Sequence, residues 1–274
     1  MSERWIEVAD RVLVRRHKEL DLSLGLVLGE DACLVVDTGG DVVHGTNWAT
    51  EVRAVTALPW QVVITHAHFD HSFGTAAFLP CPVWAHEACR AELVAEGAQQ
   101  RSHWAQVYRE QGRPEVAARI TGTDLVLPEQ LVTDRAELDL GGRTAVLVNL
   151  GVAHTSHDLV VHVPNADVLF AGDLVEHGAP PAFEGSSPAT WPAVLTRLLE
   201  LVGSRTVVVP GHGEPVNAGF VTRQRGQIAA VAELATAVQA GDLPEQEAVH
   251  RSPFPAEATL AAIKALTTRN RSGE

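Results

Sequence analysis

One stretch of the sequence decides how this chain is interpreted: Val62-Val63-Ile64-Thr65-His66-Ala67-His68-Phe69-Asp70-His71. Its opening run of β-branched residues is typical of a strand buried on both faces. In an extended chain His66 and His68 point to the same side, so both imidazoles can converge on one metal ion. Asp70 and His71 follow as the chain turns into a helix, where they can face a neighbouring point. The stretch therefore predicts two adjacent metal sites at the end of a buried strand.

Three later apolar runs lead to the same kinds of residue. The runs at 145–148, 168–170 and 207–209 lead to His154, Asp173 and His212. In layered α/β sheets, ligands assemble just beyond the strand ends, where loops carry polar groups without burying unpaired backbone. We therefore expect the side chains of the first stretch and of these three runs to form one constellation.

The composition is that of a globular protein near the upper size of a single hydrophobic core, with 274 residues, 46% of them hydrophobic and 20% charged. We expect one α/β domain over residues 1–274. Strands are expected at 11–15, 22–28, 32–37, 61–65, 82–85, 131–133, 143–149, 158–163, 167–171 and 205–209. Helices are expected at 45–57, 73–79 and 188–202, in a helical insertion at about 86–128, and in a C-terminal segment at about 219–268.

The charge pattern bears on the choice of partner. The 21 basic and 34 acidic residues give a formal net charge of −13, and the arginines are not clustered. We therefore expect a small-molecule substrate and no nucleic acid, with the protein acting as a monomer or homodimer. The chain begins without a signal-peptide pattern, and no stretch approaches the roughly 18 apolar residues of a membrane span, so we expect a cytoplasmic protein with no membrane partner.

Histidine and aspartate together indicate the chemistry of the site, because imidazole and carboxylate suit zinc, iron and manganese. Two cations only about 3.5 to 4 Å apart need a bridging anion to offset their repulsion. Asp173 is the natural bridge. Such a pair keeps a net positive charge, which stabilises an oxyanion forming in a transition state. The residues thus predict two divalent ions at a hydrolytic centre, zinc first, with iron or manganese as alternatives.

The order of the motifs resembles that of the metallo-β-lactamase-fold hydrolase superfamily over about residues 5–215. The motifs are Thr-His-x-His-x-Asp-His at 65–71, the lone His154, Ala171-Gly172-Asp173 and Pro210-Gly211-His212-Gly213. The resemblance implies an αββα sandwich. It also places His66, His68 and His154 on a first metal and Asp70, His71 and His212 on a second, with Asp173 bridging. The later motifs are similar to bacterial metallohydrolases of quinoprotein-relay and sulfur-oxidation contexts, and the ligands are similar to those of glyoxalase II.

The resemblance and the charge of the site together indicate a hydrolase. Two metal ions lower the pKa of a shared water toward about 7, so that hydroxide attacks a carbonyl. We expect the substrate to be a small-molecule ester, thioester, lactone or amide. Asp70 is the expected catalytic residue, which orients the water and shuttles its proton.

Three alternatives use part of the same ligand set. A mononuclear iron sulfur dioxygenase, resembling persulfide dioxygenases, would hold Fe(II) with His66 or His68, His154 and Asp173. A β-lactamase is disfavoured because dizinc β-lactamases usually carry Cys or Ser where Asp173 stands. A protein that holds metal without turnover requires the loss of a ligand, and no ligand is missing from the sequence.

The sequence leaves the roles of three neighbouring features open. His157 is equally suited to lining the pocket and to lying at the surface, and Asp158 is a candidate acceptor that fixes a ligand imidazole. The segment 178–185 is rich in turn formers and follows Asp173 closely, so we expect it to overhang the metal site.

Overall fold

The computed structural model describes residues 4–272. The strands of an N-terminal half and of a C-terminal half join into one hydrogen-bonded sheet. The N-terminal half contains β1 (Arg4–Ala9), β2 (Val12–His17), β3 (Leu22–Leu28), β4 (Cys33–Val36), β5 (Trp60–Val63), β6 (Val83–His86) and β7 (Gln130–Val132). The C-terminal half contains β8 (Arg135–Asp139), β9 (Thr144–Asn149), β10 (Leu159–Val163), β11 (Val168–Glu176) and β12 (Val207–His212). The order runs β7-β6-β5-β4-β3-β12-β11-β10-β9-β8, and β2 joins β1 to β3.

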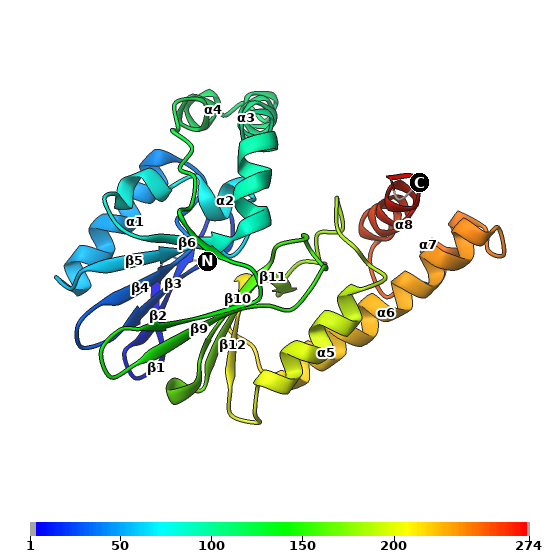
Figure 1. Cartoon of the computed structure of the whole chain (residues 1–274). Helices are drawn as coiled ribbons and strands as arrows, with labels where there is room; N and C mark the ends of the chain where they lie inside the picture. Colours follow the sequence, from blue (N-terminus) through cyan, green and yellow to red (C-terminus); the bar gives the residue numbers. More distant parts are fainter. Residues whose placement is uncertain (1–3, 273–274) are drawn as a thin grey trace.

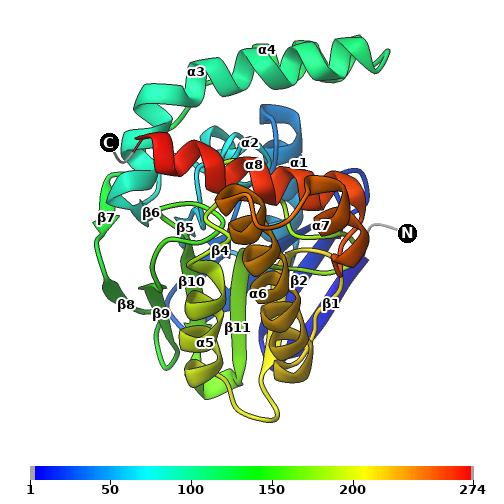
Figure 2. The same cartoon turned by 90° about the vertical axis from the view of Figure 1, so that its right-hand side faces the viewer.

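Helices cover both outer faces of the strands (Figure 1). The N-terminal half carries α1 (Val42–Val55), α3 (Glu87–Glu110) and α4 (Pro114–Thr121). The C-terminal half carries α5 (Trp191–Leu201), α6 (Ala218–Ala240) and α8 (Ala256–Ser272), which Figure 2 shows in front of the strands. The shorter helices are α2 (Phe69–Ser72), η1 (Thr75–Phe78), η2 (Pro164–Ala166) and α7 (Glu245–Arg251).

Three apolar clusters correspond to the three interfaces between these layers. The first packs α1 and α3 on the N-terminal strands, with Trp48 and Leu93 among its buried residues. The second lies between the two halves and joins Val63 of β5 to Phe170 of β11. The third packs α5, α6 and α8 on the C-terminal strands around Leu195. The expected αββα sandwich is therefore confirmed, because each half has one face on the shared interior and the other under helices.

The two halves meet at a narrow seam. Within residues 4–272, strands β3 and β12 are joined through one antiparallel pair, Leu22 with His212. Strands β4, β5 and β6 run parallel to one another, as do β11 and β12. The carboxyl ends of these parallel strands lie where loops can bring side chains together, and His212 sits at the seam itself.

The helical insertion and the C-terminal helices occupy the expected regions, but several boundaries differ. Helix α2 begins at Phe69, so Asp70 and His71 lie inside its single turn rather than before it. Strands β1 and β8 and helix α7 were not expected from the sequence. Across the described residues, no helix combines the length and apolar character needed to cross a bilayer.

Candidate metal centre

The seven predicted side chains meet at the seam between the two halves. The ligand atoms form two groups, in each of which the atoms lie within 4.8 Å of one another. We call His66, His68, His154 and Asp173 the first group, and Asp70, His71 and His212 the second group. All seven residues that the sequence predicts as ligands therefore lie close together, and the two groups together are called the seven-residue cluster below.

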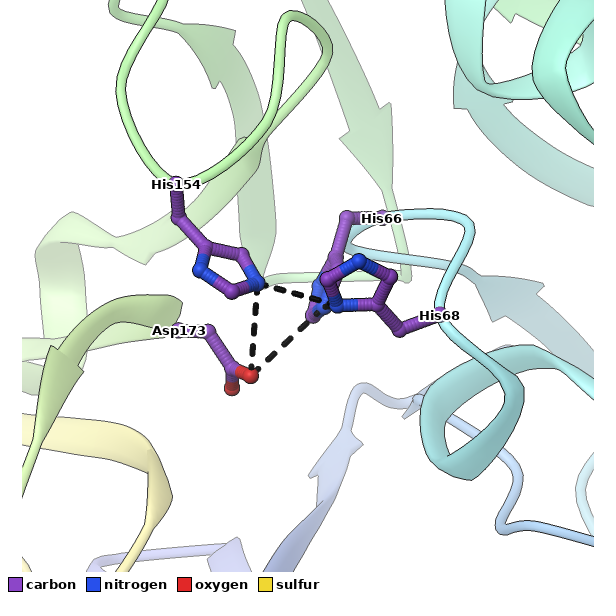
Figure 3. A group of neighbouring side chains, drawn as sticks. All are labelled: His66, His68, His154 and Asp173. Carbon is purple, nitrogen blue, oxygen red and sulfur yellow. Dashed lines mark hydrogen bonds and ion pairs between the residues drawn. The ribbon is translucent and has the colours of Figure 1, made fainter. Parts of the chain in front are cut away.

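Atoms of the first group converge on one point (Figure 3). His68 Nδ1 lies 3.0 Å from His66 Nε2 and 3.0 Å from His154 Nε2. Asp173 Oδ2 lies 3.6 Å from each of those two Nε2 atoms. The convergence of His66 and His68 does not come from strand alternation, because β5 ends at Val63 and both residues lie in the bend that follows.

The second group also borders the Asp173 carboxylate. His212 Nε2 is 3.3 Å from Asp70 Oδ2, and His71 Nε2 is 3.8 Å from the same oxygen. Asp173 approaches both imidazoles, with Oδ1 3.2 Å from His71 Nε2 and Oδ2 3.4 Å from His212 Nε2. The Asp173 carboxylate therefore approaches histidines of both groups.

Two glycines allow the Asp173 carboxylate to reach this position. Gly172 has φ +53°, and the β11–β12 register is irregular on either side of it, which redirects the chain just before Asp173. A side chain at Gly211 would place its Cβ 1.8 Å from Asp173 Oδ1. Only glycine fits at Gly211, because the carboxylate already occupies the space of a Cβ.

Acceptors on the outer side of the imidazoles fix their orientation. His66 Nδ1 faces Thr65 Oγ1 at 3.1 Å, and His71 Nδ1 faces Asp37 Oδ2 at 2.7 Å. His154 Nδ1 faces the Ala182 carbonyl at 3.3 Å, and His212 Nδ1 faces the Leu20 carbonyl at 2.8 Å. Each Nδ1 can donate its proton outward, which leaves Nε2 free to act as a ligand.

Asp37 is a site residue that the sequence analysis missed. Its carboxylate accepts hydrogen bonds from the Thr65 backbone N–H and hydroxyl, both at 2.8 Å, as well as facing His71. It directly follows the buried run of β4 and adopts φ +61°. The pattern that could have identified Asp37 in the sequence is therefore the one that identified the ligands, a polar residue that follows a buried strand.

Burial and neighbouring charges set the protonation of the cluster. Burial lowers the pKa of His66 well below its usual range and that of His154 to about 3, so both imidazoles are neutral. Burial alone would raise the pKa of Asp70, but His71 and His212 lower it to about 2. The carboxylates in turn outweigh burial and raise the pKa values of His71 and His212, with Asp173 contributing most.

Metal ions fit this donor set. Among the described residues, the buried atoms His71 Nε2 and Asp173 Oδ1 have no hydrogen-bond partner. In the first group, three nitrogens face one another, and with His66 and His154 protonated on Nδ1 only one proton can lie between them. Convergent lone pairs and two ionised carboxylates are the arrangement that divalent cations with imidazole and carboxylate ligands require.

The structure gives His157 and Asp158, whose roles the sequence left open, different hydrogen-bond partners. His157 is fully buried, and its Nε2 accepts a hydrogen bond from the Ala67 N–H at 3.1 Å. Gln100 of α3 donates to the Ala67 carbonyl at 3.3 Å, so the bend between His66 and His68 is held from two sides. Asp158 does not fix an imidazole; it accepts from the Thr155 N–H and hydroxyl, both at 2.8 Å.

The segment 178–185 contacts the cluster through Ala182. The Ala182 carbonyl faces His154 Nδ1 at 3.3 Å, while its N–H donates to Glu176 Oε1 at 2.8 Å. This segment therefore orients a side chain of the first group through its backbone.

Comparison with known proteins agrees with this geometry. The family described as the Metallo-beta-lactamase superfamily matches residues 23–212, a span that contains the whole cluster. The chain belongs to the metallo-beta-lactamase superfamily. Within it, the acyl-coenzyme A thioesterase MBLAC2 of Gallus gallus is 28% identical over 224 residues, which cover 77% of this chain and 76% of that protein.

Solved structures support the superfamily fold. A metallo-beta-lactamase from Pontibacter korlensis superposes with a TM-score of 0.65 at 19% identity, covering 83% of this chain and 99% of that chain. The sec-alkylsulfatase Pisa1 from Pseudomonas sp. superposes with a TM-score of 0.77 at 16% identity, covering 95% of this chain and 49% of that chain. At these identities the structures support the fold and not a substrate.

Proposed function

We propose that this chain is a metal-dependent hydrolase with a dinuclear centre, most suited to zinc, that cleaves an ester, thioester, lactone or amide of a small molecule. The position of Asp173 carries the proposal, because its carboxylate lies 3.2 to 3.6 Å from histidines of both groups. Superfamily membership and the MBLAC2 thioesterase relatives support hydrolysis, and the relatives favour a thioester within the substrate range.

Each residue of the cluster has a role in the proposed reaction. His66, His68 and His154 would hold one divalent ion, Asp70, His71 and His212 the other, and Asp173 both. Bound ions would supply Lewis acidity and lower the pKa of a water toward about 7. Asp70 is ionised at neutral pH, so its carboxylate can accept a hydrogen bond from that water, orient it toward the carbonyl, and then take up its proton.

The arrangement favours this reaction over its nearest rival. A mononuclear iron dioxygenase needs two histidines and one carboxylate, which the first group alone contains. Such an enzyme would not need Asp70, His71 and His212, whose ligand atoms lie beside Asp173. The two hypotheses therefore differ in whether the second group matters.

Metal analysis and anaerobic turnover test the proposal together. Protein purified without chelator should contain close to two transition-metal ions per chain. It should also hydrolyse members of an ester, thioester, lactone and β-lactam panel under argon with zinc or manganese. One ion or fewer after metal supplementation would overturn the dinuclear centre. Oxygen uptake with iron and a glutathione persulfide, without hydrolysis across the panel, would assign the chain to the rival class.

A further inference from the structure

A cavity of about 340 Å³ lies beside the seven-residue cluster, between the β2–β3 turn, α1, α3 and α4. We call it the side cavity. Two lining residues connect it to the cluster: the Leu20 carbonyl faces His212 Nδ1, and Phe69 is the neighbour of His68 and Asp70 in the chain. A group bound there would therefore lie next to the second group of ligands. Its volume is within the range of pockets that bind small molecules.

One wall of the side cavity is apolar, whereas polar and charged side chains make up the rest of the lining. Leu24, Trp48, Val116 and Ile120 line it, and each is at most 4% exposed in the protein. Phe69 adds an aromatic ring, which stacks on Trp104 at 4.4 Å between ring centroids. Such a wall favours an apolar group, because each buried CH₂ contributes roughly 0.8 kcal/mol.

The charged side chains of the lining are compensated within the protein. The ion pairs are Arg15 with Glu51, Arg119 with Asp41, and Glu19 with Arg113, which lies outside the lining. A charged ligand group would have to compete with these pairs and would lose its hydration on the apolar wall. The side cavity therefore disfavours a carboxylate or phosphate.

His44 adds a neutral ring to the lining. His44 Nδ1 accepts a hydrogen bond from the Gly40 N–H at 3.2 Å, so a neutral ring carries its proton on Nε2. Burial lowers the pKa of His44 to about 3, which keeps the ring neutral. Among the described residues, the buried Nε2 has no hydrogen-bond partner. The neutral ring therefore brings no charge to the side cavity.

We propose that the side cavity binds an uncharged aliphatic chain of the substrate. The proposal rests on the proposed hydrolase function only in calling the ligand a substrate. It predicts that chain length and charge, rather than a phosphate or carboxylate handle, determine which esters or thioesters are good substrates.

Binding to metal-free protein tests the side cavity without turnover. The probe is 2-octanone, measured by titration calorimetry on chelator-treated protein, with octanoate as the charged counterpart. The ketone should bind at least about 10-fold more tightly than octanoate, because desolvating the carboxylate is unfavourable.

A matched pair on α1 provides the control. Val43 lines the side cavity and Val55 does not, and both are 40% exposed, so tryptophan at either position leaves the core intact. Val43→Trp should weaken 2-octanone binding at least about 10-fold by occupying the space of several CH₂ groups, and Val55→Trp should not. Equal binding by the two variants, or no binding by the wild-type protein, would overturn the proposal.

Turnover separates this proposal from the proposed function. With p-nitrophenyl esters from acetate to octanoate, kcat/KM should rise with chain length in the wild-type protein and in Val55→Trp, but not in Val43→Trp. If no ester or thioester is hydrolysed while ketone binding still depends on Val43, the side cavity stands and the hydrolase function fails. A chain-length profile that is flat in all three proteins would overturn the side cavity as a substrate site.

Discussion

The seven-residue cluster and the side cavity share the segments around Leu20 and Phe69 but treat polar groups in opposite ways. In the cluster, histidine nitrogens and carboxylate oxygens approach to between 3.0 and 3.8 Å, and within the described residues His71 Nε2 has no hydrogen-bond partner. In the side cavity, charged side chains are paired with one another. Ligand atoms that converge without hydrogen-bond partners form a place for a cation. Charged side chains that pair with one another leave a surface for a neutral chain.

The polar atoms of the cluster that lack a hydrogen-bond partner lower the stability of the fold, and the surrounding structure offsets this loss. A buried polar atom without a partner destabilises the fold by about 1 to 3 kcal/mol. The cluster tolerates two such atoms, His71 Nε2 and Asp173 Oδ1, because the apolar layers and the outward hydrogen bonds, such as that between His71 and Asp37, fix the side chains in place. The following changes test whether the two regions are as independent as this contrast implies.

Asp173→Asn should have the largest effect. It removes the charge between the two groups at nearly constant volume, so metal content should fall well below two ions per chain. Turnover should fall at least about 1,000-fold, equivalent to about 4 kcal/mol of transition-state stabilisation. Elemental analysis and kcat/KM measure the two losses.

The fold and the side cavity should survive this change, because the strands that precede the ligands bury continuous apolar runs. Circular dichroism should match the wild-type protein, and metal-free Asp173→Asn should bind 2-octanone with unchanged affinity. Global unfolding, or a loss of ketone binding, would show that the two regions are not independent.

His212→Ala should have the second largest effect, because it removes a ligand of the second group while leaving the first group whole. We expect turnover to fall at least about 100-fold, the scale on which a metal-bound nucleophile loses its template. His250→Ala, an exposed histidine on α7, is the matched control and should be neutral. Unchanged turnover in His212→Ala would favour a mononuclear centre.

His157→Ala should weaken metal binding at least about 10-fold, the scale for residues that orient ligands. The reason is that His157 Nε2 holds the Ala67 N–H between His66 and His68. Competition with a chromophoric chelator measures the affinity. His157→Gln places an oxygen near the former Nε2 and should restore most of it; equal loss in both variants would contradict an orienting role.

The smallest effect concerns acid stability and the same histidine. Burial lowers the pKa of His157 to about 3, so its contribution is complete above the unfolded pKa of about 6.5 and is lost as pH falls toward 3. Between pH 7 and pH 5.5 this amounts to about 1 kcal/mol. Urea unfolding of metal-free wild-type protein should show that extra loss relative to His157→Gln, and identical losses would argue that His157 is not buried neutral.

Regular, buried elements were the ones that the sequence predicted well. Strands β5 and β11 contain the buried apolar runs at 62–63 and 168–171, and both runs were expected as strands. Strands β1 and β8 were missed because they are edge strands with mostly exposed or half-buried side chains, whose mixed polar pattern is typical of loops. Helix α2 was placed too late because a helix of four residues has no periodicity to detect.

The sequence by itself determined which residues could act as ligands, since each candidate is a histidine or aspartate that follows an apolar run. It also determined the superfamily, whose motifs are local in the chain. Only the tertiary structure decided what orients them: His212 depends on the Leu20 carbonyl, 192 residues away, and the bend at Ala67 depends on His157, 90 residues away. Such contacts leave no local pattern, because a backbone carbonyl carries no side-chain signal and a buried histidine has the same letter whether it binds a metal or another part of the chain. The side cavity, built from three helices and a turn, is likewise a product of packing alone.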